Sequence, residues 1–178
     1  IMVSIAKKLG YNELVDIGSG DGRIAFCGKI LGFTCYSIEI DNALVDLQEK
    51  IKESTNQNFN PRCEDALELD YSQLQLKHPV FFIGGLPQMG GDVLAKSIIE
   101  KIHDIANLSQ NTCLVLTGTN SKRQLSNNTV NGGWNSLITQ HDLSVLEDIS
   151  LPTVWTFDQM VETPYLFTKF IITLLFTV

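Results

Sequence analysis

The chain has 178 residues, of which 44% are hydrophobic and 19% are charged, and its formal net charge is −7. This length fits one globular domain, and we expect residues 1–178 to form a single domain. The negative charge disfavours nucleic acid as a partner, because a phosphate backbone is bound by clustered lysine and arginine side chains.

Helical and strand-like hydrophobic patterns alternate along the first two thirds of the sequence. Apolar residues recur at helical spacing in some segments, and short continuous apolar runs separate these segments. Asp41 is the expected N-cap of the third helix, since its carboxylate can accept from free backbone N–H groups. The predicted elements are helices at 2–9, 23–31, 42–54 and 91–108 and strands at 13–17, 33–40, within 60–69, at 79–86 and at 112–119.

The last third of the sequence has a different pattern. A loop rich in Asn, Ser and Gly is expected over 120–135. Strands are predicted at 143–151, 153–160 and 165–176, with no helix between them. Alternating strands and helices followed by consecutive strands predict an α/β fold. We expect a Rossmann-like, doubly wound, mostly parallel seven-stranded sheet with an antiparallel C-terminal edge.

Charge, hydropathy and cysteine usage limit which partners and which cellular compartment we expect for this protein. Beyond residue 124 one lysine stands against five carboxylates, which favours a cationic partner, although an acidic surface also serves solubility. The apolar stretch 165–178 is shorter than the ~20 residues that a membrane-spanning helix needs, so no transmembrane segment is predicted. Four cysteines lie in apolar stretches without metal-ligand or redox spacing. We therefore expect buried thiols, no metal and a cytoplasmic protein.

A glycine-rich loop follows the first predicted strand. Gly18, Gly20 and Gly22 allow a tight turn and let a ligand approach the backbone closely. The dinucleotide pattern G-x-G-x-x-G would need glycine at position 23, where Arg23 stands, and no Gly-Lys-Ser/Thr sequence follows. The acidic residues of the loop suit a ligand with a positive centre better than a pyrophosphate. A tight turn without any ligand is the alternative interpretation.

Two further acceptors follow the next two predicted strands. Glu39 lies about 20 residues beyond the glycine loop, where an acid can bind both hydroxyls of a ribose. Since Asp41 suits the helix cap better, we expect the Glu39 carboxylate to be free for a ligand. Asp65 can accept from an adenine amino group, and the N–H of Ala66 can donate to a ring nitrogen. Together these residues predict a cradle for S-adenosylmethionine.

Three stretches, VDIGSGDG at 15–22, IEID at 38–41 and EDAL at 64–67, resemble in this order the cofactor motifs of class I S-adenosylmethionine-dependent methyltransferases. The resemblance spans roughly residues 12–120. It implies that S-adenosylmethionine is the cofactor and that residues at the ends of the first four strands bind it. The cofactor-binding residues implied are Asp16, Gly18, Ser19, Gly20, Gly22, Glu39, Ile40, Asp65, Ala66 and Gly84.

A narrower resemblance concerns the acceptor. The Asp-Gly-Arg of the glycine loop, FFIGGLPQMGG at 81–91 and TVWTFD at 153–158 resemble seven-strand protein-lysine methyltransferases. The most similar group modifies the adenine nucleotide translocase and the ATP synthase c-subunit in mitochondria. The resemblance implies methyl transfer to a lysine amine of a protein substrate. Gln88 would then orient the amine, Pro87 would stiffen the loop, and Trp155 would form a wall for the lysine stem.

Other interpretations of the same residues stay open. Trp155 can be a core residue, and Pro87 and Gln88 can form an ordinary turn. The acceptor can be a small molecule, or the chain can bind S-adenosylmethionine without catalysis. A nucleic-acid acceptor is disfavoured, because the (Asn/Asp)-Pro-Pro-(Tyr/Phe) motif that base-methylating enzymes of the resembled fold usually carry does not follow the fourth strand.

Overall fold

A computed structural model describes residues 1–84, 92–118, 133–152 and 162–171. These residues form a seven-stranded sheet with the strand order β3-β2-β1-β4-β5-β7-β6. Strands β1 to β5 are parallel, and β7 pairs antiparallel with both β5 and β6, which confirms the predicted fold class. The strands are β1 (Glu13–Ile17), β2 (Thr34–Glu39), β3 (Asn60–Cys63), β4 (Pro79–Ile83), β5 (Cys113–Thr117), β6 (Leu143–Pro152) and β7 (Glu162–Phe170).

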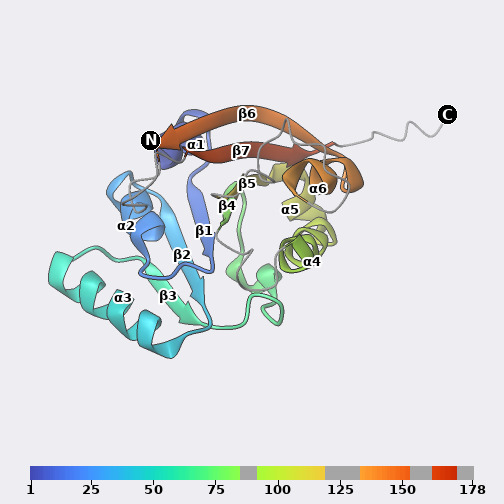
Figure 1. Cartoon of the computed structure of the whole chain (residues 1–178). Helices are drawn as coiled ribbons and strands as arrows, with labels where there is room; N and C mark the ends of the chain where they lie inside the picture. Colours follow the sequence, from blue (N-terminus) through green and yellow to red (C-terminus); the bar gives the residue numbers. More distant parts are fainter. Residues whose placement is uncertain (85–91, 119–132, 153–161, 172–178) are drawn as a thin grey trace.

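Helices cover both faces of the sheet (Figure 1). Helices α1 and α2 pack on one face, and α4, α5 and α6 pack on the other. Helix α3 runs beside β2 and β3 at one end of the sheet. The helices are α1 (Met2–Lys8), α2 (Arg23–Ile30), α3 (Asn42–Thr55), α4 (Asp92–His103), α5 (Ala106–Asn111) and α6 (Trp134–Gln140), with a 3₁₀ turn η1 (Tyr71–Leu74) before β4.

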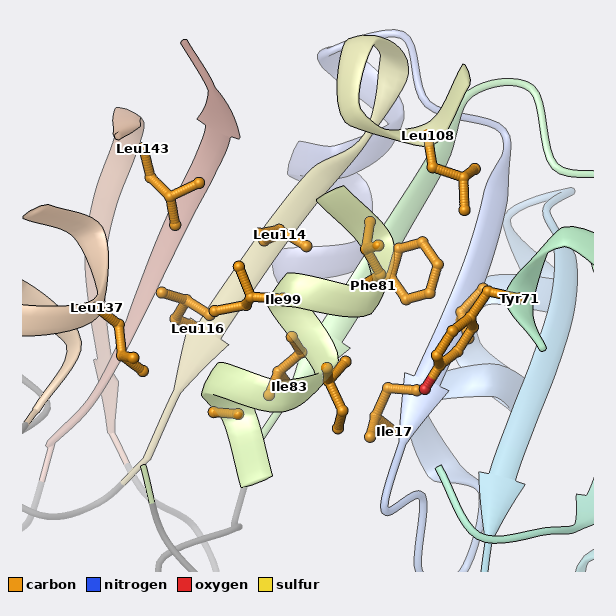
Figure 2. Packing of buried hydrophobic residues seen from close by; sticks show 14 of the residues in the cluster. Ile17, Tyr71, Phe81, Ile83, Ile99, Leu108, Leu114, Leu116, Leu137 and Leu143 are labelled. Atoms are coloured by element: carbon orange, nitrogen blue, oxygen red, sulfur yellow. The ribbon is translucent and has the colours of Figure 1, made fainter. Parts of the chain in front are cut away.

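Side chains alternate along the strands between two apolar cores. Phe81 and Ile83 of β4 face the core under α4, whereas Val80 and Phe82 face the core under α1 and α2. In the first core the Tyr71 ring meets Phe81 edge-on, with ring centroids 5.6 Å apart (Figure 2). Because each central strand is buried on both faces, its sequence is a continuous apolar run, and this run is why the strands were predictable.

One predicted helix is wrong in its length. The segment 91–108 forms two helices, α4 and α5, because Ile105 has an extended backbone (φ −93°, ψ 102°). Hydrophobic spacing continues through this break and therefore does not reveal it. The side chain of Asn107 donates to the Leu76 carbonyl at 2.9 Å, a contact between distant segments that orients α5.

The predicted loop over 120–135 is wrong at its end, because α6 begins at Trp134 after Gly133 at φ 109°. Trp134, Leu137 and Ile138 are buried at helical spacing. The turn η1 was not predicted. The strand predicted at 153–160 lies outside the described residues, as does the end of the strand predicted at 165–176.

The expectation of buried cysteines is half correct. Cys35 and Cys113 are buried, whereas Cys27 and Cys63 are exposed, and all four are free thiols. Burial raises the pKa of Cys35 and Cys113 to about 12, so both stay protonated at neutral pH. Among the helices in the described ranges, none has the length and apolar character needed to cross a membrane.

Candidate functional site

The glycine loop sits at the carboxyl end of β1. Gly18, Gly20 and Gly22 have φ angles of 65°, 57° and 74°, a region that other residues adopt only with strain. The N–H groups of Gly18 and Ser19 donate to the Ile38 carbonyl of β2 at 2.9 and 3.1 Å. A Cβ atom added at Gly20 would meet no atom within 4 Å. The loop is therefore held on the sheet with open space above Gly20.

Glu39, the last residue of β2, holds the loop from the neighbouring strand. Its Oε2 accepts from the Gly20 N–H at 2.8 Å, and its Oε1 accepts from the N–H groups of Ile40 and Asp41 at 2.9 and 3.1 Å. The expectation of a free carboxylate is therefore wrong, although Asp41 caps α3 through the Ala43 N–H as predicted. A carboxylate has about four lone-pair positions, so Glu39 retains capacity for one ligand hydroxyl.

Asp16 belongs to β1, directly before the glycine loop, and is 4% exposed. Its Oδ2 atom makes no hydrogen bond to another residue within the described part of the chain. Burial, together with the negative charges of Asp21 and Glu39, raises the pKa of Asp16 to about 7, and the backbone amide of Ala25 opposes this shift. A buried carboxyl of this kind can hold a proton or face a cationic ligand group.

Asp21 is engaged differently from Asp16. Its Oδ2 forms an ion pair with Arg23 Nη2 at 2.6 Å; the Arg23 side chain is largely exposed and that of Asp21 is partly exposed. The hydrogen bond to Arg23 lowers the pKa of Asp21. Because this charge is balanced within the loop, Asp21 is less suited than Asp16 to attract a cationic ligand, contrary to the expectation that both acids serve that purpose.

The third acceptor lies beyond β3. Asp65 Oδ1 accepts from the Leu67 N–H at 2.8 Å and so fixes the turn. The Ala66 carbonyl accepts from the Tyr71 hydroxyl at 2.9 Å, and the Leu67 carbonyl accepts from Lys101 of α4. The Ala66 N–H makes no hydrogen bond to another described residue. The predicted adenine contacts therefore lie on a turn that two other elements hold in place.

Two more predicted cofactor residues, Ile40 and Gly84, follow the carboxyl ends of β2 and β4. Ile40 is 58% exposed beside Glu39 and offers an apolar surface next to the loop. Gly84 follows β4, where a Cβ atom would come within 2.7 Å of Thr117 Cγ2 on β5. Packing alone therefore favours glycine at position 84. The predicted acceptor-site residues Pro87, Gln88 and Trp155 lie outside the described residues.

The sequence interpretation missed Gln48, the polar residue that holds the loop from α3. This side chain is fully buried, and its Nε2 donates to the Gly20 carbonyl at 2.7 Å and to Ser19 Oγ at 3.0 Å. A Cβ atom at Gly22 would lie 2.9 Å from the Gln48 side chain. A signal was present in the sequence: Gln48 comes three residues after Val45, on the buried face of the helix.

The glycine loop, Glu39 and the Asp65–Ala66 turn lie at the carboxyl ends of β1, β2 and β3, and Gly84 follows the carboxyl end of β4. Between β1 and β4 the strand order reverses, and in open α/β sheets ligands bind at such a point. The site offers carboxylates, a free N–H and an open glycine loop, which suit an adenosine with an amino group. Within the described ranges no three His, Cys, Asp or Glu side chains gather in a way that could hold a metal ion.

Sequence comparison finds no matching protein-family model and no significant match among curated proteins. Comparison of structures finds methyltransferases. Magnesium protoporphyrin IX methyltransferase from Synechocystis PCC 6803, with bound S-adenosylmethionine, has a TM-score of 0.67 at 11% identity, over 96% of this chain and 76% of that one. The Pyrococcus horikoshii protein PH1948, an RNA methyltransferase candidate, has a TM-score of 0.67 at 13% identity, over 96% and 82% of the two chains.

A third structure supports the same relationship. A S-adenosylmethionine-dependent methyltransferase from Clostridium acetobutylicum has a TM-score of 0.65 at 7% identity, over 95% of this chain and 89% of that one. At these identities the comparison establishes similarity of fold. The chain thus has the Rossmann-like fold of the S-adenosylmethionine-dependent methyltransferases.

Proposed function

We propose that this protein transfers a methyl group from S-adenosylmethionine to an acceptor, and that the acceptor is a lysine amine of a protein. The proposal rests mainly on one observation. The glycine loop, Glu39 and the Asp65–Ala66 turn converge at the switch point of a sheet with the methyltransferase strand order. The three methyltransferase structures share this fold.

The described residues suit the three parts of S-adenosylmethionine. The remaining capacity of the Glu39 carboxylate suits a ribose hydroxyl, and the Ala66 N–H with the Asp65 carboxylate suits the adenine edge. The open space above Gly20 suits the amino-acid tail, and the orphaned Asp16 Oδ2 suits its cationic amine. When bound, the cofactor supplies an electrophilic methyl group on a sulfonium, so the protein needs to position a neutral nucleophile and exclude water.

A lysine acceptor is supported by charge and by sequence. The chain has a formal net charge of −7, which favours the approach of a lysine-bearing, cationic protein. The stretches at 81–91 and 153–158 resemble protein-lysine methyltransferases, and Gln88, Pro87 and Trp155 are the proposed acceptor-site residues. The amine must lose its proton before it attacks, and desolvation in a closed site would lower its pKa.

A small-molecule acceptor is the second candidate. The similar structure from Synechocystis belongs to an enzyme whose name gives magnesium protoporphyrin IX as its substrate, and it matches over 96% of this chain. The same arrangement of strands is therefore compatible with an acceptor that is not a protein. The two candidate acceptors differ in the side chains that would have to surround the transferred methyl group.

The test is a labelling experiment with a matched control. The protein is incubated with methyl-labelled S-adenosylmethionine and a lysate of its source organism, and the label is followed into protein and small molecules. Glu39→Ala should abolish labelling. Glu13→Ala should not, because Glu13 lies at the amino end of β1, away from the glycine loop, and accepts two backbone N–H groups there. Label on a lysine of a discrete protein supports the first proposal, label on small molecules supports the second, and binding without label contradicts both.

A further inference from the structure

Three buried polar side chains form a chain of hydrogen bonds behind the glycine loop. The Ser37 hydroxyl of β2 lies 2.6 Å from Gln48 Oε1, and Gln48 Nε2 lies 3.0 Å from Ser19 Oγ and 2.7 Å from the Gly20 carbonyl. Ser37 and Gln48 are fully buried, and Ser19 is 8% exposed. Buried polar groups are costly unless they are paired, so this chain is a specific arrangement.

The direction of every hydrogen bond in this chain follows from one group. The Gly20 carbonyl can only accept, so the Gln48 amide must present its nitrogen to Gly20 and its oxygen to Ser37. The second N–H of that nitrogen then donates to Ser19 Oγ. Ser19 is consequently an acceptor toward Gln48, and its own proton must point elsewhere.

The Ser19 proton has no acceptor among the residues that the structure describes. Ser19 stands between Gly18 and Gly20, beside the open space where a Cβ atom would meet nothing. A serine that is more than nine-tenths buried and retains a free proton next to a ligand cradle is suited to donate to a ligand acceptor. In S-adenosylmethionine the carboxylate of the amino-acid tail is the strongest acceptor, and charge-assisted hydrogen bonds to it are strong.

We propose that Gln48 is a positioning residue, which holds Ser19 so that its hydroxyl donates to the carboxylate of the bound amino-acid tail. This inference rests on the proposed function, because it presumes an S-adenosylmethionine-type ligand. Gln48 also fixes the Gly20 carbonyl, while Glu39 fixes the Gly20 N–H, so the two side chains hold both peptide groups at the centre of the loop. Helix α3 thereby takes part in recognition of the cofactor tail without touching it.

The test compares two ligands that differ in the tail. S-adenosylhomocysteine carries the amino acid, whereas 5′-methylthioadenosine has the same nucleoside without it. By isothermal titration, Ser19→Ala should weaken S-adenosylhomocysteine binding roughly 10- to 100-fold. It should weaken methylthioadenosine binding less than about threefold, since the nucleoside makes no contact with Ser19. Gln48→Met, which fills a similar volume without the donor, should show the same ligand preference.

Controls separate positioning from folding. Ser54→Ala changes an exposed serine on the same helix and should alter neither affinity. The Ser19→Ala/Gln48→Met double variant should lose less affinity than the sum of the single losses, because both act through one hydroxyl. Equal weakening of both ligands by either single variant would overturn the inference. Failure of the unaltered protein to bind either ligand would overturn the proposed function itself, so the two failures are distinguishable.

Discussion

The two halves of the sheet are stabilised in different ways. At the carboxyl ends of β1, β2 and β3, side chains such as Glu39, Gln48 and Asp65 hold backbone groups through hydrogen bonds. In β4 and β5 every residue is buried, and the contacts are those of apolar packing. The proposed cofactor cradle thus depends on a few polar contacts, whereas the stability of the fold depends on the apolar strands beside it.

Variants in the two halves of the sheet should therefore behave differently. A change in the apolar half should lower the free energy of unfolding and leave cofactor affinity nearly intact in the folded fraction. A change in the polar half should lower affinity more than its effect on stability would require. Stability is therefore measured by denaturant unfolding, and affinity by titration with a ligand.

The largest expected effect is on stability. Phe81 on β4 is fully buried and packs against Tyr71, so Phe81→Ala leaves a large cavity. Such substitutions cost about 3–5 kcal/mol, and we expect that loss in urea unfolding. Affinity for S-adenosylhomocysteine, measured where the variant is folded, should change less than about threefold. A tenfold loss of affinity would contradict the separation of the two halves.

The second effect concerns pH and Asp16, whose pKa is raised by burial and by the charges of Asp21 and Glu39 from 3.8 to about 7. The folded state then binds a proton that the unfolded state releases above pH 4, so stability falls as pH rises from 4 to 7. The loss is at most about 4 kcal/mol. Asp16→Asn should remove this slope in unfolding measured from pH 4 to 8. An unchanged slope in the variant would assign the dependence to other groups.

Local contacts explain which structural features the sequence predicts well. The strand predicted at 13–17 matches β1, and Asp41 caps α3 as expected, because both depend on neighbouring residues. The glycine loop was also recognisable, since left-handed backbone at Gly18, Gly20 and Gly22 leaves glycine as the preferred residue. Propensity, capping and turn chemistry act within a few residues and are therefore visible in the sequence.

Contacts between distant residues explain what the sequence did not predict. Glu39 seemed free because its contact with the Gly20 N–H, which joins it to the loop, spans 19 residues, although its two other partners are close to it in the sequence. Gln48 was overlooked because it bonds to Ser19, 29 residues away. The break between α4 and α5 at Ile105 follows from packing and from the Asn107–Leu76 contact, which no local pattern contains. The candidate site was thus predictable in its residue types, but not in the contacts that hold them.

The third prediction compares three glycines with positive φ. Gly10→Ala, Gly20→Ala and Gly22→Ala each force an alanine into a strained backbone, at a cost of ~1–2 kcal/mol. Gly22→Ala should cost more, since its Cβ would lie 2.9 Å from Gln48. Only Gly20→Ala and Gly22→Ala should weaken ligand binding, by tenfold or more, because Gly10 precedes the amino end of β1. Equal affinity losses in all three would argue against a ligand above the loop.

We expect the smallest changes in stability and affinity at Tyr71, which lies between the apolar and the polar halves of the sheet. Tyr71 belongs to the apolar core through its ring and to the cradle through its hydroxyl, which donates to the Ala66 carbonyl. Burial raises the pKa of Tyr71, so the hydroxyl stays protonated and remains a donor. Tyr71→Phe keeps the ring contact with Phe81 and should cost only about 1 kcal/mol of stability.

The hydroxyl of Tyr71 should matter more for binding than for packing. Without it the Asp65–Ala66 turn loses one of its supports, and affinity for 5′-methylthioadenosine should fall roughly two- to fivefold, the worth of one modest hydrogen bond. Tyr36→Phe is the matched control, because the Tyr36 hydroxyl bonds to no other described residue and its ring also packs on the core. If both variants lower affinity equally, binding of the adenine end of the ligand does not depend on the Tyr71 hydroxyl. Tyr71 would then belong only to the apolar half of the sheet.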